Sequence, residues 1–201
     1  MSLDSQPSTR LGVAGWCLYD WANSAFPTVI ITFVFAAYFT KGVAADEVTG
    51  TALWGQAIGW SALVVAVMGP IVGAISDHTG RRKPWLFAST LGCSIACGFL
   101  WTIIPDENMV LRALILIGAA NIAFELGMVF YNAMLADLVS SDRIGRVSGW
   151  GWGTGYAGGL IYLVLFVQME TPLFYLNRDV AEHLRAVGPF VAIWMVLFAA
   201  P

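Results

Sequence analysis

The chain alternates between long apolar segments and short polar connections. The apolar segments cover residues 16–40, 53–76, 84–104, 109–139, 147–168 and 188–201. A helix needs about 20 apolar residues to cross the hydrocarbon core of a bilayer, and the first five segments reach that length. The pattern therefore predicts an all-α fold class, a polytopic membrane helix bundle with six transmembrane helices.

Composition supports this class and excludes others. Hydrophobic residues make up 58% of the 201 residues and charged residues only 11%, whereas soluble domains carry about 25% charged residues. The net charge of −3 argues against a nucleic-acid partner. Cys93 and Cys97 share a helix face without a nearby histidine, so we interpret them as small packing residues and expect no metal and no cofactor. No His-Glu-x-x-His or nucleophile–base arrangement occurs, so we expect no enzyme.

The densest cluster of charge lies between the second and third apolar segments, in residues 73–86 (GAISDHTGRRKPWL). Gly80 can adopt the positive φ of a sharp turn, which predicts a tight hairpin. Asp77 is close enough in sequence to pair with Arg81 across this turn. Three consecutive basic residues starting at Arg81 favour the cytoplasmic side, which also places the amino terminus inside.

The first apolar segment carries a polar stripe. Asp20, Asn23, Ser24 and Pro27 fall within about one third of the helix circumference. A carboxylate at bilayer depth usually faces protein or a wet cavity, so Asp20 and Asn23 are candidates for a solute or proton pathway. The alternative is that Asp20 lies at the cytoplasmic interface, where it reaches the headgroups or caps the helix.

The fourth segment carries a second stripe. Asn121, Glu125, Met128 and Asn132 fall within about 60° of one another on a helix. An acid flanked by two amides near the middle of a span predicts the lining of a cavity, with Asn121, Glu125 and Asn132 as pathway residues. The alternative is a seam in which these polar side chains join neighbouring helices by hydrogen bonds.

Glycines recur along one side of the fifth segment. Gly151, Gly155 and Gly159 are spaced by four residues, so they share a face of the helix. Small residues at this spacing let another helix approach closely. The fifth segment is therefore predicted to pack tightly on a neighbour through its glycine face.

The hairpin resembles the loop signature of the major facilitator superfamily, because Gly73, Asp77, Gly80, Arg81 and Arg82 stand at that family's intervals. The resemblance implies a twelve-helix secondary transporter with two six-helix halves that rock about a midplane site. These five residues would form a cytoplasmic gate hairpin. Residues 1–201 would be the amino-terminal half.

Three further blocks resemble one branch of that superfamily: residues 19–26 (YDWANSAF), residues 130–137 (FYNAMLAD) and the glycine-rich fifth segment. The branch contains the fungal autophagy-related vacuole effluxer and bacterial relatives, and its fungal members are associated with amino-acid export. The chain lacks the Arg-x-x-Gln-Gly pattern of many proton-coupled members after Arg112. It also has Gly155-Tyr156 where drug antiporters have Gly-Pro.

The resemblance implies a transporter that moves a small polar solute such as an amino acid by alternating access, and we expect it in a bacterial cytoplasmic membrane. A membrane scaffold or receptor subunit that transports nothing is the alternative. The expected partners are the lipid bilayer, the solute, and a missing carboxyl-terminal half or a second half-transporter. The sixth segment has only 14 residues, so we expect the chain to stop inside its last helix and to be a fragment of a longer protein.

Overall fold

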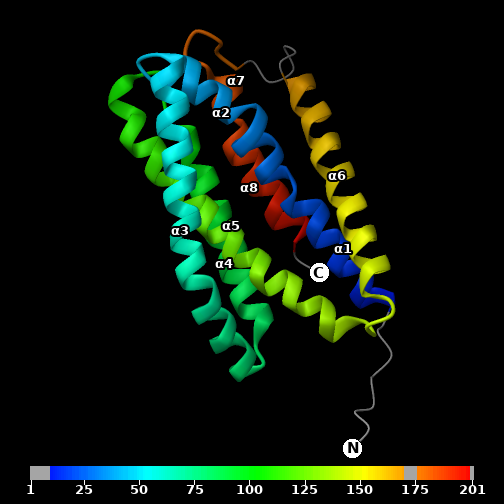
Figure 1. Cartoon of the computed structure of the whole chain (residues 1–201). Helices are drawn as coiled ribbons and strands as arrows, with labels where there is room; N and C mark the ends of the chain where they lie inside the picture. The colour runs from blue at the N-terminus through cyan, green and yellow to red at the C-terminus, as the bar shows by residue number, and fades with distance from the viewer. Residues whose placement is uncertain (1–9, 170–175, 200–201) are drawn as a thin grey trace, which may run out of the picture.

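The computed structural model describes residues 10–169 and 176–199, which form helices joined by short connections (Figure 1). Six helices correspond to the six apolar segments: α1 (Arg10–Asn23), α3 (Glu47–Thr79), α4 (Arg82–Phe99), α5 (Val110–Leu138), α6 (Ile144–Met169) and α8 (Val187–Phe198). No strand occurs among the described residues. The all-α prediction is confirmed.

The first apolar segment changes its winding part-way along. After α1 the chain continues as a π-helix, η1 (Phe26–Phe33), then as α2 (Phe35–Tyr38) and a second π-helix, η2 (Phe39–Val43). Pro27 occupies the first turn of η1, and a proline there removes one backbone donor from the helix. The helix is therefore wider after Pro27, in a form that often occurs at functional sites.

Four helical stretches are long and apolar enough to cross a membrane: Arg10–Val43, Glu47–Thr79, Arg82–Thr102 and Glu107–Leu138. Two of these include short 3₁₀ turns, η3 (Leu100–Thr102) and η4 (Glu107–Met109). The helix α6 has 26 residues, which is also enough for a span. The described part of α8 has 12 residues. The last two residues of the sixth apolar segment lie outside the described residues.

The ends of α3 have clear local causes. Asp46 caps its first turn, and the carboxylate accepts hydrogen bonds from the backbone N–H groups of Val48 (3.0 Å) and Thr49 (2.9 Å). Hydrogen bonds from Thr49 lower the pKa of Asp46. At the other end Gly80 adopts φ of 64°, and α4 begins two residues later. The predicted tight hairpin at Gly80 is confirmed.

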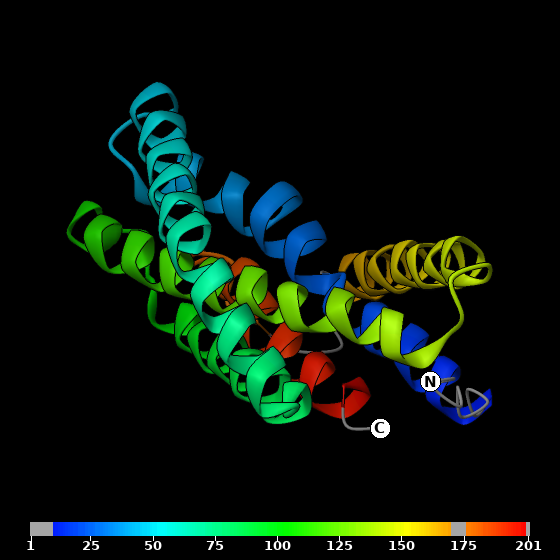
Figure 2. The ribbon, with the colours of Figure 1, turned by 60° about the horizontal axis from the view of Figure 1, so that its bottom comes forward.

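The helices pack as neighbours around α5 and α1. The long helix α5 contacts α4 on one side and α3 on another, while α1 contacts α6, and α8 lies against α4. Figure 1 shows α3 and α6 at opposite edges of the bundle, and Figure 2 shows them from below, well separated. The two edge helices therefore leave much of their apolar surface outside the bundle.

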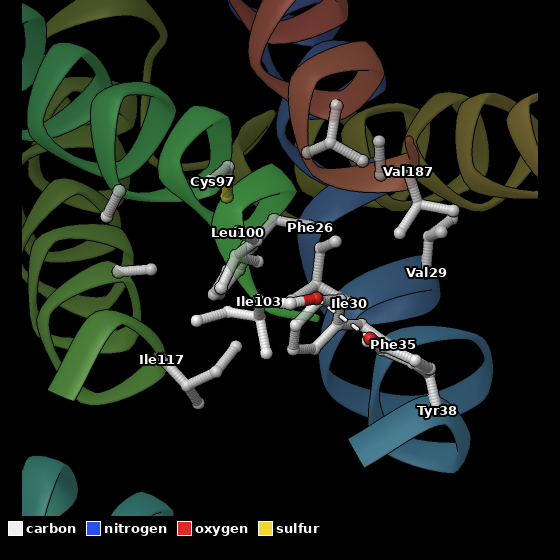
Figure 3. Packing of buried hydrophobic residues seen from close by; sticks show 14 of the residues in the cluster. Phe26, Val29, Ile30, Phe35, Tyr38, Cys97, Leu100, Ile103, Ile117 and Val187 are labelled. Carbon is white, nitrogen blue, oxygen red and sulfur yellow. Dashed lines mark hydrogen bonds between the residues drawn. The ribbon is translucent and has the colours of Figure 1, made fainter. Parts of the chain in front are cut away.

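The main core lies at the end of the bundle away from the hairpin. It joins fully buried side chains from four helical segments: Phe26, Val29 and Ile30 of η1, Leu100 of η3, Ile117 of α5 and Val187 of α8 (Figure 3). A smaller cluster nearer the hairpin contains Trp16, Tyr19 and Tyr131. The two clusters hold α1, α4 and α5 in fixed register for the polar residues between them.

Buried polar groups tie the loops of the core end to the bundle. The side chain of Arg185, on the short helix α7 (Glu182–Arg185), donates to the carbonyl of Trp101 and lies over its ring at 4.9 Å. Tyr38 donates to the carbonyl of Ile103 at 2.8 Å. Buried polar groups require such partners, so these bonds anchor α7 and the end of α4 in one arrangement.

Candidate functional site

The hairpin between α3 and α4 is built around Arg82. Its Nε and Nη2 atoms donate to one oxygen of Asp77 at 3.0 and 2.7 Å. The predicted pairing of Asp77 with Arg81 is wrong. Gly80 reverses the chain in such a way that Arg82, the first residue of α4, faces back toward the end of α3, while Arg81 is exposed.

Arg82 also reaches a third helix. Its Nη1 atom donates to the carbonyl of Ala133 at 3.2 Å and to the carboxylate of Asp137, both on α5. The Arg82 side chain is only 22% exposed, because α5 covers it. A planar guanidinium has several donors in a fixed arrangement, so it can serve both acids together. The hairpin is therefore fastened to α5 as well as closed on itself.

Gly73, one of the predicted hairpin residues, has a packing role within α3. A Cβ atom at Gly73 would lie 3.7 Å from Val129 of α5, and one at Gly69 would lie 3.8 Å from the same residue. The two glycines allow α3 to lie against α5 just above the hairpin. The structure thus joins Gly73 and Arg82 to α5 and Asp77 to Arg82, and Gly80 supplies the turn.

The polar stripe of α1 faces two different neighbours. Asp20 and Ser24 face α6, where a Cβ atom at Gly155 would lie 2.5 Å from Asp20 Oδ2 and 2.6 Å from Ser24 Oγ. Asn23 is buried and its amide donates to the sulfur of Met128 on α5 at 2.9 Å. Asp20 therefore lies against the glycine face of α6, while Asn23 belongs to the contact between α1 and α5.

The glycine face of α6 packs tightly on a neighbouring helix as predicted, and that neighbour is α1. A Cβ atom at Gly151 would collide with the ring of Trp16, and one at Gly159 would lie 2.7 Å from the Thr28 hydroxyl. Gly158, which the four-residue spacing did not include, lies closest to backbone: its Cβ would be 2.5 Å from the carbonyl oxygen of Trp21. Successive turns of α6 thus follow α1 at a distance that only glycine permits.

The stripe of α5 also divides. Asn121 is buried and donates to the hydroxyl of Ser61 on α3 at 2.8 Å. This hydrogen bond between helices is the kind expected from the alternative interpretation, a polar seam rather than a cavity lining. Met128 contacts α1 through Asn23. Glu125 and Asn132 are exposed, and at 100° per residue they lie on the side of α5 between Met128, which meets α1, and Val129, which meets α3.

The open face of α5, defined here by Glu125 and Asn132, therefore presents a carboxylate and an amide near the middle of a span. A charged group is costly at that depth unless water, protein or a solute meets it. Asp20 of α1 is partly exposed but lies against α6, away from this face. A carboxylate and an amide at this depth are suited to bind a cation or an ammonium group.

Comparison with known proteins identifies the family of the chain. The profile of the Major Facilitator Superfamily matches residues 4–163, which is most of the chain. The chain belongs to the major facilitator superfamily. It is 35% identical over 195 residues to a protein of Bacillus subtilis (strain 168) named "Uncharacterized MFS-type transporter YxiO". The match covers 92% of this chain and 44% of that relative, so the chain spans less than half of its length. No solved structure matches.

Family membership and the apolar helices make the chain an integral membrane protein of a transporter family. This membership points to transport rather than catalysis. Among residues 10–169 and 176–199, no three histidine, cysteine or acidic side chains are grouped to hold a metal ion. Cys93 and Cys97 are fully buried in the main core, where they serve as packing residues.

Sequence reasoning missed an aromatic cluster beside Asp20. The rings of Trp16 and Tyr131 stack at 4.3 Å, and those of Tyr19 and Tyr131 at 5.0 Å. The Trp16 indole donates to the carbonyl of Tyr131 at 3.0 Å, and Tyr19 shares a hydrogen bond with Thr90 of α4. These contacts join α1, α4 and α5. A tyrosine directly before one polar residue of each stripe, Tyr19 before Asp20 and Tyr131 before Asn132, was the available signal.

Asp137 was also missed as part of the hairpin site. It lies in the last turn of α5, 55 residues from Arg82 in sequence. The sequence places it near the end of the fourth apolar segment that lies at the same level as the hairpin. That shared level could have suggested a contact between Asp137 and the hairpin. The sequence of the turn does not show which of its basic residues meets Asp137.

Proposed function

We propose that this chain forms the amino-terminal six-helix half of a secondary active transporter that moves a small polar solute by alternating access. The observation that carries the proposal is the open face of α5, where Glu125 and Asn132 are exposed within a span. A bundle that only needed its helices joined would bury these groups against a neighbour, as it does Asn121 against Ser61.

The solute that fits best carries an ammonium group, and an amino acid is the specific proposal. Asp20 and Glu125 are both acids. Neither α1 nor α5 carries a lysine or arginine near the middle of its span, within the described residues. A carboxylate attracts an ammonium strongly where water is scarce. The resemblance to the vacuole effluxer branch supports the same choice of solute.

The hairpin is proposed as the cytoplasmic gate. Arg82 links the end of α3 to the end of α5 through Asp77 and Asp137. A movement of either helix relative to the other must therefore stretch or break one of these two ion pairs. The basic run beside it favours the cytoplasm, with the amino terminus inside and a bacterial cytoplasmic membrane as the location. Gly73 and Gly80 supply the close packing and the turn that this gate needs.

The test is uptake of labelled amino acids by proteoliposomes that contain the purified full-length protein. Glu125→Gln keeps the side-chain size and removes the charge, so we expect uptake to fall about ten- to hundredfold, the loss of one hydrogen bond to a charged group. Glu107→Gln, in the exposed turn η4 before α5, is the matched control and should transport normally.

Two results separate the parts of the proposal. Normal uptake by Glu125→Gln would remove Glu125 from the pathway. Uptake of another polar solute, but of no amino acid, would retain transport and reject the amino-acid assignment.

A further inference from the structure

A row of oxygen atoms on the first helical stretch faces the glycines of α6. A Cβ atom at Gly155 would lie 2.5 Å from Asp20 Oδ2 and 2.6 Å from Ser24 Oγ. One turn further along, a Cβ atom at Gly159 would lie 2.7 Å from Thr28 Oγ1 and 3.4 Å from the carbonyl oxygen of Ser24. A carboxylate, two hydroxyls and a carbonyl therefore lie along the contact between the two helices.

The oxygen atoms of Asp20 and Ser24 are close enough to share one small ligand. They lie 2.5 and 2.6 Å from the same point, so they are at most about 5 Å apart. A hard cation that takes oxygen ligands at about 2.3–2.6 Å spans that distance with two bonds. Asp20, Ser24 and Thr28 are each partly exposed, so one side of the row is open for an ion to enter.

The side chains of this row have no partners of their own within residues 10–169 and 176–199. Asp20, Ser24 and Thr28 form no side-chain hydrogen bond and no ion pair there. The basic residues of the two helices, Arg10 and Arg146, lie more than two helical turns before Asp20 and Gly155. A carboxylate within a span is costly unless a counter-charge or water meets it, so this row calls for a cation.

A buried hydroxyl beside the row also lacks a partner. Tyr131 of α5 is 2% exposed, and its hydroxyl forms no hydrogen bond in the part of the chain that the structure describes. This oxygen lies 3.2 Å from a Cβ atom placed at Gly151, one turn before Gly155, and the charge of Asp20 acts on it. Buried hydroxyls normally have a partner, so this end of the contact also favours a polar ligand.

The charge of the row and the kind of its ligands select the ion. One carboxylate balances one positive charge, whereas a divalent ion would leave an excess charge within the membrane. Carboxylate, hydroxyl and carbonyl oxygens suit hard cations, and transition metals prefer imidazole or thiolate ligands. A proton needs the carboxylate alone, whereas hydroxyls at successive turns add ligands for a metal ion. Na⁺ is close to Ca²⁺ in size and fits the oxygen distance, and K⁺ is larger.

We propose that α1 and α6 bind one Na⁺ ion between them, through the carboxylate of Asp20 and the hydroxyls of Ser24 and Thr28. This ion is the coupling ion of the transporter, a role that rests on the proposed function. Asp20 is thereby assigned to the ion and Glu125 to the solute. The glycines of α6 let the ligands of α1 lie at the helix contact, where a larger side chain would displace them.

The test of the site measures binding of radioactive Na⁺ to the purified full-length protein in detergent, without solute and with choline as the replacing cation. We expect one saturable site in the wild type and none in Asp20→Asn. Ser24→Ala removes one ligand and should weaken binding about tenfold, the contribution of one hydrogen bond to a charged group. Thr32→Ala is the matched control and should bind normally, because the Thr32 hydroxyl donates to the carbonyl of Pro27 outside the row.

The coupling role is tested by amino-acid uptake into proteoliposomes with a Na⁺ gradient or a proton gradient. We expect the Na⁺ gradient to drive uptake, and Ser24→Ala to need about tenfold more Na⁺ than the wild type or Thr32→Ala. Lack of saturable Na⁺ binding, or equal affinity in the wild type and Ser24→Ala, would overturn the site whatever the uptake. Uptake that follows only the proton gradient would overturn the coupling role. Normal Na⁺ binding without uptake of any amino acid would support the ion site and reject the solute assignment.

Discussion

The close contact of α6 with α1 predicts opposite outcomes for two glycine substitutions on the same helix. In Gly158→Ala the new Cβ atom lies 2.5 Å from the carbonyl oxygen and 3.0 Å from the Cα atom of Trp21. Both atoms are backbone, so they cannot rotate away, and the two helices must separate. In Gly153→Ala the Cβ atom meets nothing within 4 Å.

The magnitude follows from the difference between the two variants. Replacing glycine by alanine favours a helix by about 1 kcal/mol in each, and this gain cancels in the comparison. What remains is the overpacking at Gly158, which costs about 1–3 kcal/mol in a well-packed interior. We therefore expect Gly158→Ala to have a free energy of unfolding about 1–3 kcal/mol lower than that of Gly153→Ala.

The assay is reversible unfolding of the purified protein in mixed micelles with increasing sodium dodecyl sulfate, followed by the loss of helical circular dichroism. Wild type and both variants are compared in the same micelles, so that the detergent contributes equally. If Gly158→Ala and Gly153→Ala unfold at the same detergent fraction, α6 does not lie against the backbone of α1, and the account of the glycine face is refuted.

Three further predictions concern the hairpin and the cap of α3. The Arg82–Asp137 pair is partly covered, so a double-mutant cycle with Arg82→Gln and Asp137→Asn should give a coupling energy of about 0.5–1 kcal/mol in the same unfolding assay, and no coupling would exclude the pair. His78→Cys should resist a membrane-impermeant thiol reagent in intact cells and react after permeabilisation; labelling from outside would reverse the proposed orientation. Asp46→Ala should lower the unfolding midpoint at neutral pH, because the pKa of the capping carboxylate is depressed in the folded state. The stabilisation by this carboxylate is present above its ordinary pKa and is lost as the pH falls through its folded-state pKa. Wild type and variant should therefore unfold at the same midpoint in acid, and a difference that stays constant with pH would contradict the cap.

The order and extent of the helices were predictable from the sequence because their causes are local. Each of the six apolar segments forms a helix, and the boundaries agree within a few residues, apart from the starts of the first two helices at Arg10 and Glu47, each six residues before the predicted start. The turn at Gly80 was predictable because a positive φ there suits glycine alone. The transition to π-helix after α1 was only hinted at by Pro27, because winding depends on how the whole segment packs.

The candidate site was predictable as a set of faces, but its partners were not. The periodicity of α5 placed Asn121, Glu125 and Asn132 in one sector of the helix, yet Asn121 bonds to Ser61 while the other two stay exposed. A helical wheel assigns side chains to one side of a helix within about 60°, and two neighbouring helices can divide that sector between them. Membrane depth alone therefore did not distinguish a seam from an open face.

By itself, the sequence determined the membrane class, the helix spans, the hairpin turn and the presence of a glycine face on α6. These follow from segment length against bilayer thickness, from backbone sterics at Gly80 and from side-chain size. Only the tertiary structure decided that Arg82 rather than Arg81 meets Asp77, that Asp137 joins them from 55 residues away, and that α1 is the helix which the glycines meet. The physical reason is that contacts between helices depend on their rotation and crossing, which arise from the packing of all the side chains together and are not written in any one segment.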